Sequence, residues 1–432
     1  MSKKKDKDKE KDKEKSAHPW RDNIEAITIS IVIIVLFKYF ILEAYKIPTG
    51  SMQPTLMGWD SGQHKSDVFD RVLVDKLSYH VRDPERWEVV VFKYPLDKSK
   101  NFIKRLWGMP GEEMQVHCGD VMVRQPDGEW AIPRRSDHLL ESMLKKLNST
   151  GQWHLPAKGW KLQGDDLIAT AEGQASFPRT RSTVKDRYGD GYPGDIGPLI
   201  ERTKKRLAIN DVGDLRLQTE VCPDAKCRSV EFEFREGIRR YRFSIPGPAN
   251  SAPGPATLTI SGLIGSDEVG PVLSEEMFTL EAGSCSTIQV QNIDDQVRLM
   301  IDGDVIIEAD VETVLQVDLT NTGINLRSTG GGAEFRGIQI WRDIYYTSDQ
   351  KYNQWNIPEG HYVMLGDNTQ DSSDGRDWHL TGYEIQGEDG AKMQVHGNPR
   401  DNENPQVVPG AIGGPQIFFK DLLGERHVFR QK

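Results

Sequence analysis

The first residue of this chain whose setting could support chemistry is a serine between a glycine and a methionine. Ser51 lies in IPTGSMQPTL, shortly after an apolar run, AITISIVIIVLFKYFIL, that ends at Leu42. A serine beside a glycine usually marks only a turn. It becomes a nucleophile when a neighbouring base removes its proton. The identity of a base therefore decides between a turn and a catalytic site.

A neutral lysine is the candidate base. None of the ten histidines lies in a G-x-S-x-G or similar setting, and HExxH is absent. At the ordinary lysine pKa of about 10.4, only about one amine in 2,500 is unprotonated at neutral pH. Burial among apolar side chains lowers that pKa by up to ~3–5 units. Lys104 fits because NFIKRLW surrounds it with Phe102, Ile103, Leu106 and Trp107, although a lysine in a strand is more often a surface charge.

The segment before Ser51 predicts a membrane anchor. Residues 1–23 form a charged tail that we expect to be disordered, and the first 21 residues hold nine Lys/Arg. Residues 24–45 predict a single transmembrane helix, with Lys38 near its far end. A cleaved signal peptide is the alternative, although no A-x-A site follows. Because Lys/Arg-rich flanks stay in the cytoplasm, the N-terminus is predicted there and the rest on the outer side.

Composition limits the remaining possibilities. A chain of 432 residues suggests two or three domains, and its net charge of -10 argues against nucleic-acid binding. There are four cysteines and no CxxC pair. The segment CPDAKC, Cys222 to Cys227, could close a small disulfide loop or hold two unpaired thiols, while Cys118 and Cys285 support no inference. We expect no metal and no cofactor.

The soluble part predicts a mainly β protein in which one domain interrupts another. Residues 46–133 and 354–432 share a texture of short β-branched and aromatic strands, with a hairpin in MQVHCGDVMVRQPDGEWAI. The inserted domain is predicted over 134–353. It begins with a short helix in SDHLLESMLKKLN and becomes jelly-roll-like, a β-sandwich, from about 158 to 347.

Four blocks in order resemble the characteristic boxes of type I signal peptidases (leader peptidases). They are IPTGSMQPTL, DRVLVDKLSY, IKRLWGMPGEE and LGDNTQDSSDGRDW, and the resemblance runs from about 24 to 113 and from about 360 onward. It implies that Ser51 is the nucleophile and Lys104 the general base. It also implies an oxyanion hole from the Ser51 N–H and the Thr49 hydroxyl, with Ser372 orienting the lysine. The 46–133 and 354–432 segments would then form the catalytic β domain.

The same resemblance implies supporting residues. Asp374 and Arg376 match an ion pair, Asp367 and Asn368 a turn, and Arg105 part of the lysine box. Apolar residues near the dyad could line the pockets for small substrate residues or be ordinary core: Ile47, Pro48, Met52, Leu56 and Ile103. The chain departs from the family with Gly375 in place of the common Ser and His379 in place of the common Gly.

The implied function is that of a membrane-anchored serine endopeptidase which cleaves signal peptides from exported pre-proteins. It would lie in the cytoplasmic (inner) membrane, in contact with the lipid bilayer, with its catalytic domain on the outer or periplasmic side. The insert resembles concanavalin-like (laminin-G-like) jelly rolls in GWKLQGDDLIATAEG, DLRLQTEV and FRGIQIWRDIYYT, and such folds often bind carbohydrate or protein. Two alternatives stay open: an inactive anchored binding protein that uses the insert, and a dedicated regulatory protease of related fold.

Overall fold

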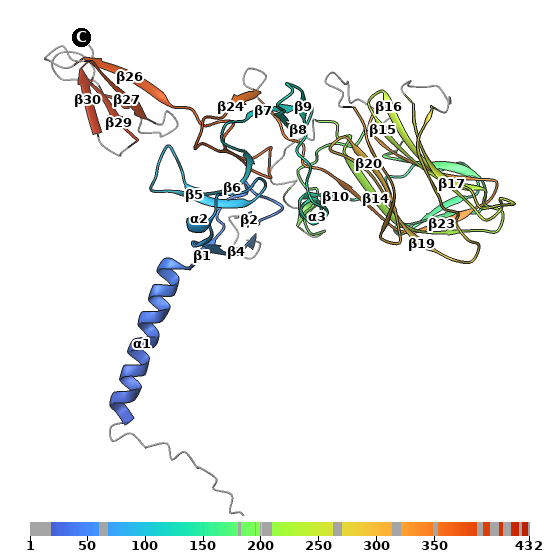
Figure 1. The fold of residues 1–432 in the computed structure, drawn as a ribbon, viewed down its shortest axis with the longest axis horizontal. Coiled ribbons are helices and arrows are strands. Elements are labelled where there is room, and N and C mark those ends of the chain that lie inside the picture. The colour runs from blue at the N-terminus through green and yellow to red at the C-terminus, as the bar shows by residue number, and fades with distance from the viewer. Residues whose placement is uncertain are drawn as a thin grey trace, which may run out of the picture.

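The computed structural model shows a mainly β protein with one long N-terminal helix (Figure 1). This confirms the predicted fold class, including a β-sandwich within the chain. The predicted disorder of residues 1–23 is wrong for residues 19–23, which are helical, and its remaining part, residues 1–18, falls outside the described residues. The structure describes residues 19–59, 68–149, 151–179, 183–194, 196–198, 200, 210–261, 270–312, 321–348, 353–386, 392–397, 406–408, 416–422 and 426–430.

Helix α1 (Pro19–Phe40) leads directly into the β part of the molecule. Its stretch Asn23–Phe40 is long and apolar enough to cross a membrane, by length and composition. The transmembrane helix predicted over 24–45 is wrong at its C-terminal end. The helix ends at Phe40, and the following residues form strand β1 (Leu42–Lys46), which pairs antiparallel with β4 (Arg71–Asp75). This pairing gives the backbone groups of β1 the hydrogen bonds that a further helical turn would have supplied.

A three-stranded sheet, in the order β25–β6–β5, carries Lys104. Its strands are β5 (Val89–Lys93), β6 (Asn101–Gly108) and β25 (Val363–Leu365). Lys104 lies opposite Val90 in the antiparallel β5–β6 ladder. Strand β25 reaches β6 only after the chain has passed through the sandwich, so residues more than 250 positions apart meet here.

A four-stranded sheet, β24–β7–β8–β9, shares a buried core with the three-stranded sheet. The hairpin predicted from the Cys-Gly-Asp signal is confirmed, because β7 and β8 pair across Cys118 and Gly119, both at positive φ. The buried core joins Trp107 and Met114 to Tyr346 and Leu365. The strands are β7 (Glu113–His117), β8 (Asp120–Arg124), β9 (Trp130–Ala131) and β24 (Gln354–Asn356).

Two larger sheets face one another as a sandwich, on the right of Figure 1. Phe232 and Phe243 from the six-stranded sheet and Leu217 and Val290 from the eight-stranded sheet are fully buried in one core. The boundaries of this inserted domain at 134 and 353 stay a prediction.

The bounds of the sandwich strands follow the sequence texture closely. The eight-stranded sheet runs β11–β12–β23–β14–β19–β20–β21, with β10 beside β23. Its strands are β10 (Lys145–Lys146), β11 (Trp160–Gln163), β12 (Asp166–Ala169), β14 (Leu215–Pro223), β19 (Ser286–Ile293), β20 (Gln296–Ile301), β21 (Asp304–Asp310) and β23 (Ala333–Arg342). The six-stranded sheet runs β13–β22–β15–β16–β17–β18. Its strands are β13 (Gly173–Phe177), β15 (Ser229–Glu236), β16 (Arg239–Pro246), β17 (Pro255–Ser261), β18 (Val272–Met277) and β22 (Gly323–Thr329).

The short elements include one correction. The helix predicted over 136–148 is only α3 (Asp137–Met143), because Leu144 is extended and Lys145 already pairs with β23. The sheet partner therefore overrides the helical pattern of MLKKLN. The remaining elements are α2 (Ser78–Val81), β2 (Gly58–Trp59), β3 (Val68–Phe69), β26 (Thr381–Gln386), β27 (Lys392–Gly397), β28 (Gln406–Val408), β29 (Gln416–Lys420) and β30 (Arg426–Arg430).

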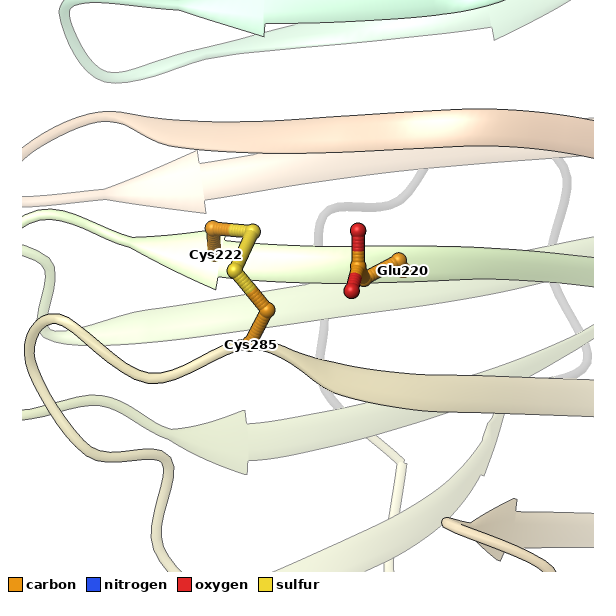
Figure 2. A group of neighbouring side chains, drawn as sticks. All are labelled: Glu220, Cys222 and Cys285. Atoms are coloured by element: carbon orange, nitrogen blue, oxygen red, sulfur yellow. A yellow bond between two sulfur atoms is a disulfide. The ribbon is translucent and has the colours of Figure 1, made fainter.

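A disulfide joins Cys222 of β14 to Cys285 at the start of β19 (Figure 2). The suggested Cys222–Cys227 loop is wrong. Val221 and Ser286 lie opposite each other in the β14–β19 ladder, which brings the Cα atoms of Cys222 and Cys285 to 4.3 Å. Cys227 is instead a free, buried thiol in the sandwich core.

Candidate active site

Ser51 and Lys104 are in direct contact. The Lys104 Nζ donates a hydrogen bond to the Ser51 Oγ, although the two residues lie 53 positions apart. Ser51 belongs to the turn that follows Ile47, and Lys104 lies in the middle of β6. Only 8% of Ser51 and 3% of Lys104 is exposed. Bulk water therefore has little access to either side chain.

The surroundings of Lys104 make its amine a usable base. Burial lowers the pKa of Lys104 to about 8, with the carboxylates of Asp374 and Asp367 opposing this effect and Arg376 adding to it. The Phe102 ring lies 5.6 Å from Nζ. Near neutral pH a tenth or so of such amines is uncharged, in place of roughly one in 2,500 for an ordinary lysine. Lys104 is therefore buried and has a lowered pKa, as a candidate base requires.

The backbone around Ser51 is held from both sides. The Asn368 N–H donates to the Ser51 carbonyl at 3.1 Å, and the Asn368 Nδ2 donates to the Gly50 carbonyl at 2.7 Å. Within the turn, the Gln53 N–H bonds to the Gly50 carbonyl at 3.1 Å. A Cβ on Gly50 would lie 2.8 Å from the Gln53 Oε1, so glycine suits this position. The Ser51 N–H has no hydrogen-bond partner within the described part of the chain.

Two buried ion pairs support the dyad. Arg105, next to Lys104, binds the Asp367 carboxylate with two hydrogen bonds of 2.9 and 2.6 Å. Arg376 binds Asp374 at 2.7 Å, as the resemblance implied. Burial would raise the pKa of each carboxyl, but the partner guanidinium lowers it below its ordinary value. Both aspartates therefore stay charged and fix the loop after β25.

The predicted oxyanion and lysine-orienting residues lie around the pair. Thr49 is exposed, and its hydroxyl has no protein partner among the described residues. The Ser372 Oγ is buried and lies against Gly366, where a Cβ would come within 2.1 Å of it. It makes no hydrogen bond to Lys104 among the described contacts. The roles of both hydroxyls stay predictions.

The predicted pocket residues separate into two groups. Met52 is fully buried and Ile47 is 3% exposed, so both support the site from inside the core. Leu56 and Ile103 are half-buried and Pro48 is exposed. Only these three present surface, and their contact with substrate stays a prediction.

The departures from the family pattern have small local effects. The Gly375 N–H donates to the Met364 carbonyl at 2.8 Å. A Cβ on Gly375 would lie 3.0 Å from that same carbonyl oxygen, which is tight for any side chain. His379 is exposed. Neither residue touches Ser51 or Lys104 in the described contacts.

Sequence reasoning missed a group of residues from the insert that reach the site. Lys145 is buried, and its Nζ donates to the Asp367 carbonyl at 3.0 Å. Tyr188 and Tyr192 bond to Asn368 and Gln53 respectively. The only signal was a pair of tyrosines in the Gly- and Asp-rich stretch RYGDGYPGD.

Two groups of described residues have ligand atoms close enough for a metal ion. In the first, Glu220 lies beside Cys222 and Cys285, whose sulfurs are consumed by the disulfide (Figure 2). The second is Asp120, Asp214 and Asp294. Burial and neighbouring carboxylates raise the pKa of Asp120 and Asp214 well above the ordinary value, so protons can neutralise them. Neither group includes Ser51 or Lys104.

A serine hydroxyl bonded to a buried lysine amine, on a mainly β scaffold, has the arrangement of a serine hydrolase with a lysine base. A model of the family "Signal peptidase, peptidase S26" matches residues 20–158 and 293–388, more than half of the chain. The chain therefore belongs to the signal peptidase family, peptidase S26. Both Ser51 and Lys104 lie inside the first matched stretch.

Individual relatives agree with this assignment. Signal peptidase I of Pseudomonas fluorescens is 38% identical over 166 residues, which is 31% of this chain and 55% of the relative. The probable signal peptidase I-2 of Synechocystis sp. is 38% identical over 110 residues, 24% of this chain and 45% of the relative. Signal peptidase I of Leptolyngbya laminosa is 36% identical over 129 residues, 28% and 58% respectively. The chain spans about half the length of these relatives.

Among solved structures, a carbohydrate binding module from Bacillus subtilis aligns with 43% of this chain and 93% of its own, at 8% identity and a TM-score of 0.28. A score this low supports no conclusion about what the insert binds.

Proposed function

We propose that this protein is a membrane-anchored serine endopeptidase which cleaves signal peptides from exported pre-proteins. The observation that carries the proposal is the hydrogen bond from the buried Lys104 amine to the Ser51 hydroxyl. Membership of the signal peptidase family supports the same substrate class.

The chemistry proceeds in two stages. The Ser51 Oγ forms a bond to the scissile carbonyl carbon while Lys104 Nζ accepts its proton and passes it to the leaving amine as the C–N bond breaks. A water molecule then attacks the acyl-serine ester, gives its proton to Nζ, and Nζ returns a proton to the Ser51 Oγ. The free Ser51 N–H and the exposed Thr49 hydroxyl are the donors for the carbonyl oxygen in both stages. Such a donor contributes roughly 2.7–4 kcal/mol to the transition state.

The position of Ser51 suits a substrate that is still held in a membrane. Ser51 lies 11 residues beyond Phe40, the last residue of α1, so even a fully extended chain would put it within about 40 Å of the helix end. The nine Lys/Arg near the N-terminus favour a cytoplasmic tail. The catalytic part then lies on the outer or periplasmic side of the cytoplasmic membrane, against the bilayer. A carbohydrate or protein ligand of the sandwich stays a prediction from sequence.

The test is cleavage of a pre-protein by the full chain in detergent micelles or liposomes. Ser51→Ala and Lys104→Ala should each reduce cleavage to the uncatalysed background, because nucleophile and base act as a unit. Lys161→Ala is the matched control, because Lys161 is an exposed lysine on strand β11 of the sandwich. Wild-type cleavage by Lys104→Ala would refute the dyad, and cleavage of one partner protein but no general pre-protein would favour a dedicated regulatory protease.

A further inference from the structure

We propose that the loop 186–192 of the insert positions the catalytic turn, and that the Tyr188 hydroxyl orients the Ser51 N–H through Asn368. This inference rests on the proposed function, because it assigns a role in the same reaction. It makes the sandwich a part of the catalytic apparatus and not only an attached module.

The central link is the Asn368 side-chain amide. Its nitrogen donates to the Gly50 carbonyl at 2.7 Å and to the Tyr188 hydroxyl at 2.8 Å. An amide nitrogen carries two hydrogens, so both are used. The Tyr188 hydroxyl donates in turn to the Asp371 carboxylate at 3.2 Å. Burial raises the pKa of Tyr188 to about 12, so its hydroxyl keeps this proton.

This link reaches the reacting atoms through one peptide bond. The Gly50 carbonyl and the Ser51 N–H belong to the same peptide unit, which is planar, so fixing one group fixes the direction of the other. The Asn368 N–H holds the Ser51 carbonyl on the following unit at 3.1 Å. Tyr188 is thus a positioning residue for the oxyanion donor, and it makes no described contact with Lys104.

Further contacts connect the same loop to the nucleophile turn. The Tyr192 hydroxyl donates to the Gln53 Oε1 at 2.8 Å. Gly191, at φ +79, lies so close to the turn that a Cβ there would come within 2.9 Å of the Pro54 ring. On the other side, Gln370 donates to the Asp186 carbonyl at 2.6 Å. The loop therefore holds both the turn that carries Ser51 and the loop that carries Asn368.

The sandwich anchors this loop from behind. Arg342, at the end of β23, donates to the Asp190 carboxylate at 2.6 Å and to the Arg187 carbonyl at 3.0 Å. Arg342 is 3% exposed and Asp190 is 8% exposed, so water competes weakly for these bonds. The Gly191 N–H bonds to the Lys146 carbonyl of β10 at 2.9 Å. The position of the loop is thus set by two strands of the eight-stranded sheet.

The test compares kcat and KM across pH for the full chain and four variants on a peptide that spans a signal-peptide cleavage site. Removal of an oxyanion donor costs about 10²–10³ in kcat, so a misdirected donor should cost less, about tenfold. We expect Tyr188→Phe to lower kcat about tenfold with KM unchanged, because the bond acts only in the transition state. The midpoint of its pH profile should stay at the wild-type value, because Tyr188 does not contact Lys104.

The controls separate positioning from general loosening. Tyr241→Phe removes another buried hydroxyl of the insert, one that donates to Glu236 at 3.0 Å, and should leave kcat unchanged. Asn368→Ala should lower kcat, and adding Tyr188→Phe to it should cause no further loss, because both act through one bond.

A wild-type kcat for Tyr188→Phe would overturn the inference. So would an undiminished loss in the Asn368→Ala background, or an upward shift of the pH midpoint, which would indicate that water has reached Lys104. These results leave the proposed function intact if Ser51→Ala remains inactive. An active Ser51→Ala would instead refute the proposed function itself.

Discussion

Arg105 and Asp367 are joined by two parallel hydrogen bonds, although 262 positions separate them in the chain. Arg105 follows the dyad lysine on β6, and Asp367 precedes Asn368. Asp367 also accepts a hydrogen bond from the Thr55 hydroxyl at 2.6 Å. One carboxylate thus ties together the lysine strand, the nucleophile turn and the loop after β25.

Asp367→Asn should be strongly destabilising. It leaves the Arg105 guanidinium buried without a counter-charge, and breaking a buried pair in this way typically costs about 3–5 kcal/mol. We expect a clearly lower melting temperature in a thermal denaturation scan. Glu113→Gln is the matched control, because it removes the exposed pair with Arg124, and such pairs contribute about 0–1 kcal/mol. Equal melting temperatures for the two variants would contradict this role of Asp367.

Activity should rise with pH through a midpoint near the pKa of Lys104, about 8. Only the neutral amine can accept the Ser51 proton, and its fraction increases as pH passes the pKa upward. The measurement is kcat/KM of the full chain between pH 6 and 10, on a substrate with no titrating group in that range. A profile that is flat across this interval would exclude Lys104 as the titrating base.

Lys104→Met should abolish cleavage and yet stabilise the fold at pH 7. Burial lowers the pKa of Lys104 to about 8, so the unfolded chain, with its ordinary lysine pKa, binds the proton more tightly. Stability therefore rises with pH wherever the unfolded state binds more protons. At pH 7 the charged amine costs the folded state a few kcal/mol, at about 1.4 kcal/mol per pKa unit.

We therefore expect a higher melting temperature for Lys104→Met at pH 7, with the difference shrinking as the pH approaches about 10. Lys161→Met, at an exposed position, should change neither activity nor melting temperature. A lower melting temperature for Lys104→Met at pH 7 would show that the amine is not desolvated.

Replacing both Cys222 and Cys285 by serine should weaken the sandwich. The disulfide closes a loop with a sequence separation of 63 residues. Because the cross-link lowers the conformational entropy of the unfolded chain, a loop of this length stabilises the folded state by about 4 kcal/mol. Thermal unfolding with and without dithiothreitol checks this: the reductant should lower the wild-type melting temperature and leave the double variant unchanged. A reductant effect of equal size on both proteins would place the sensitivity elsewhere.

Local patterns predict the strands well, whereas the pairing of Ser51 with Lys104 follows from the family resemblance and not from the local pattern. The flanking Phe102, Ile103 and Leu106 make Lys104 a candidate for burial, but a lysine in a strand is more often a surface charge, so the local pattern alone does not decide. The Cys-Gly turn between β7 and β8 is also readable, because few residues tolerate its positive φ values. The catalytic roles of these residues remain predictions.

Features that depend on contacts between residues far apart in the chain could not be predicted from local sequence patterns. The helical pattern before Lys145 ends early because β23, almost 200 positions later, takes that residue as a strand partner. Cys222 forms its disulfide with Cys285 and not with Cys227, which is nearer in sequence, because the register of the β14–β19 ladder places Cys285 opposite Cys222. The contact of Tyr188 with Asn368 joins loops 180 positions apart in the chain, and no periodicity or motif encodes that placement.

The junction between α1 and β1 contains no flexible linker, because Ile41 alone separates the two elements. The Ile41 N–H bonds back to Phe37 at 2.9 Å, its carbonyl accepts from Lys76 at 3.0 Å, and β1 begins at the next residue. A flexible linker would let the β part rotate relative to α1, but both backbone groups of the connecting residue are hydrogen-bonded. The β part is therefore joined to α1 through a single hydrogen-bonded residue, and under the proposed function this direct connection would fix the height of the Ser51 turn relative to the end of the helix.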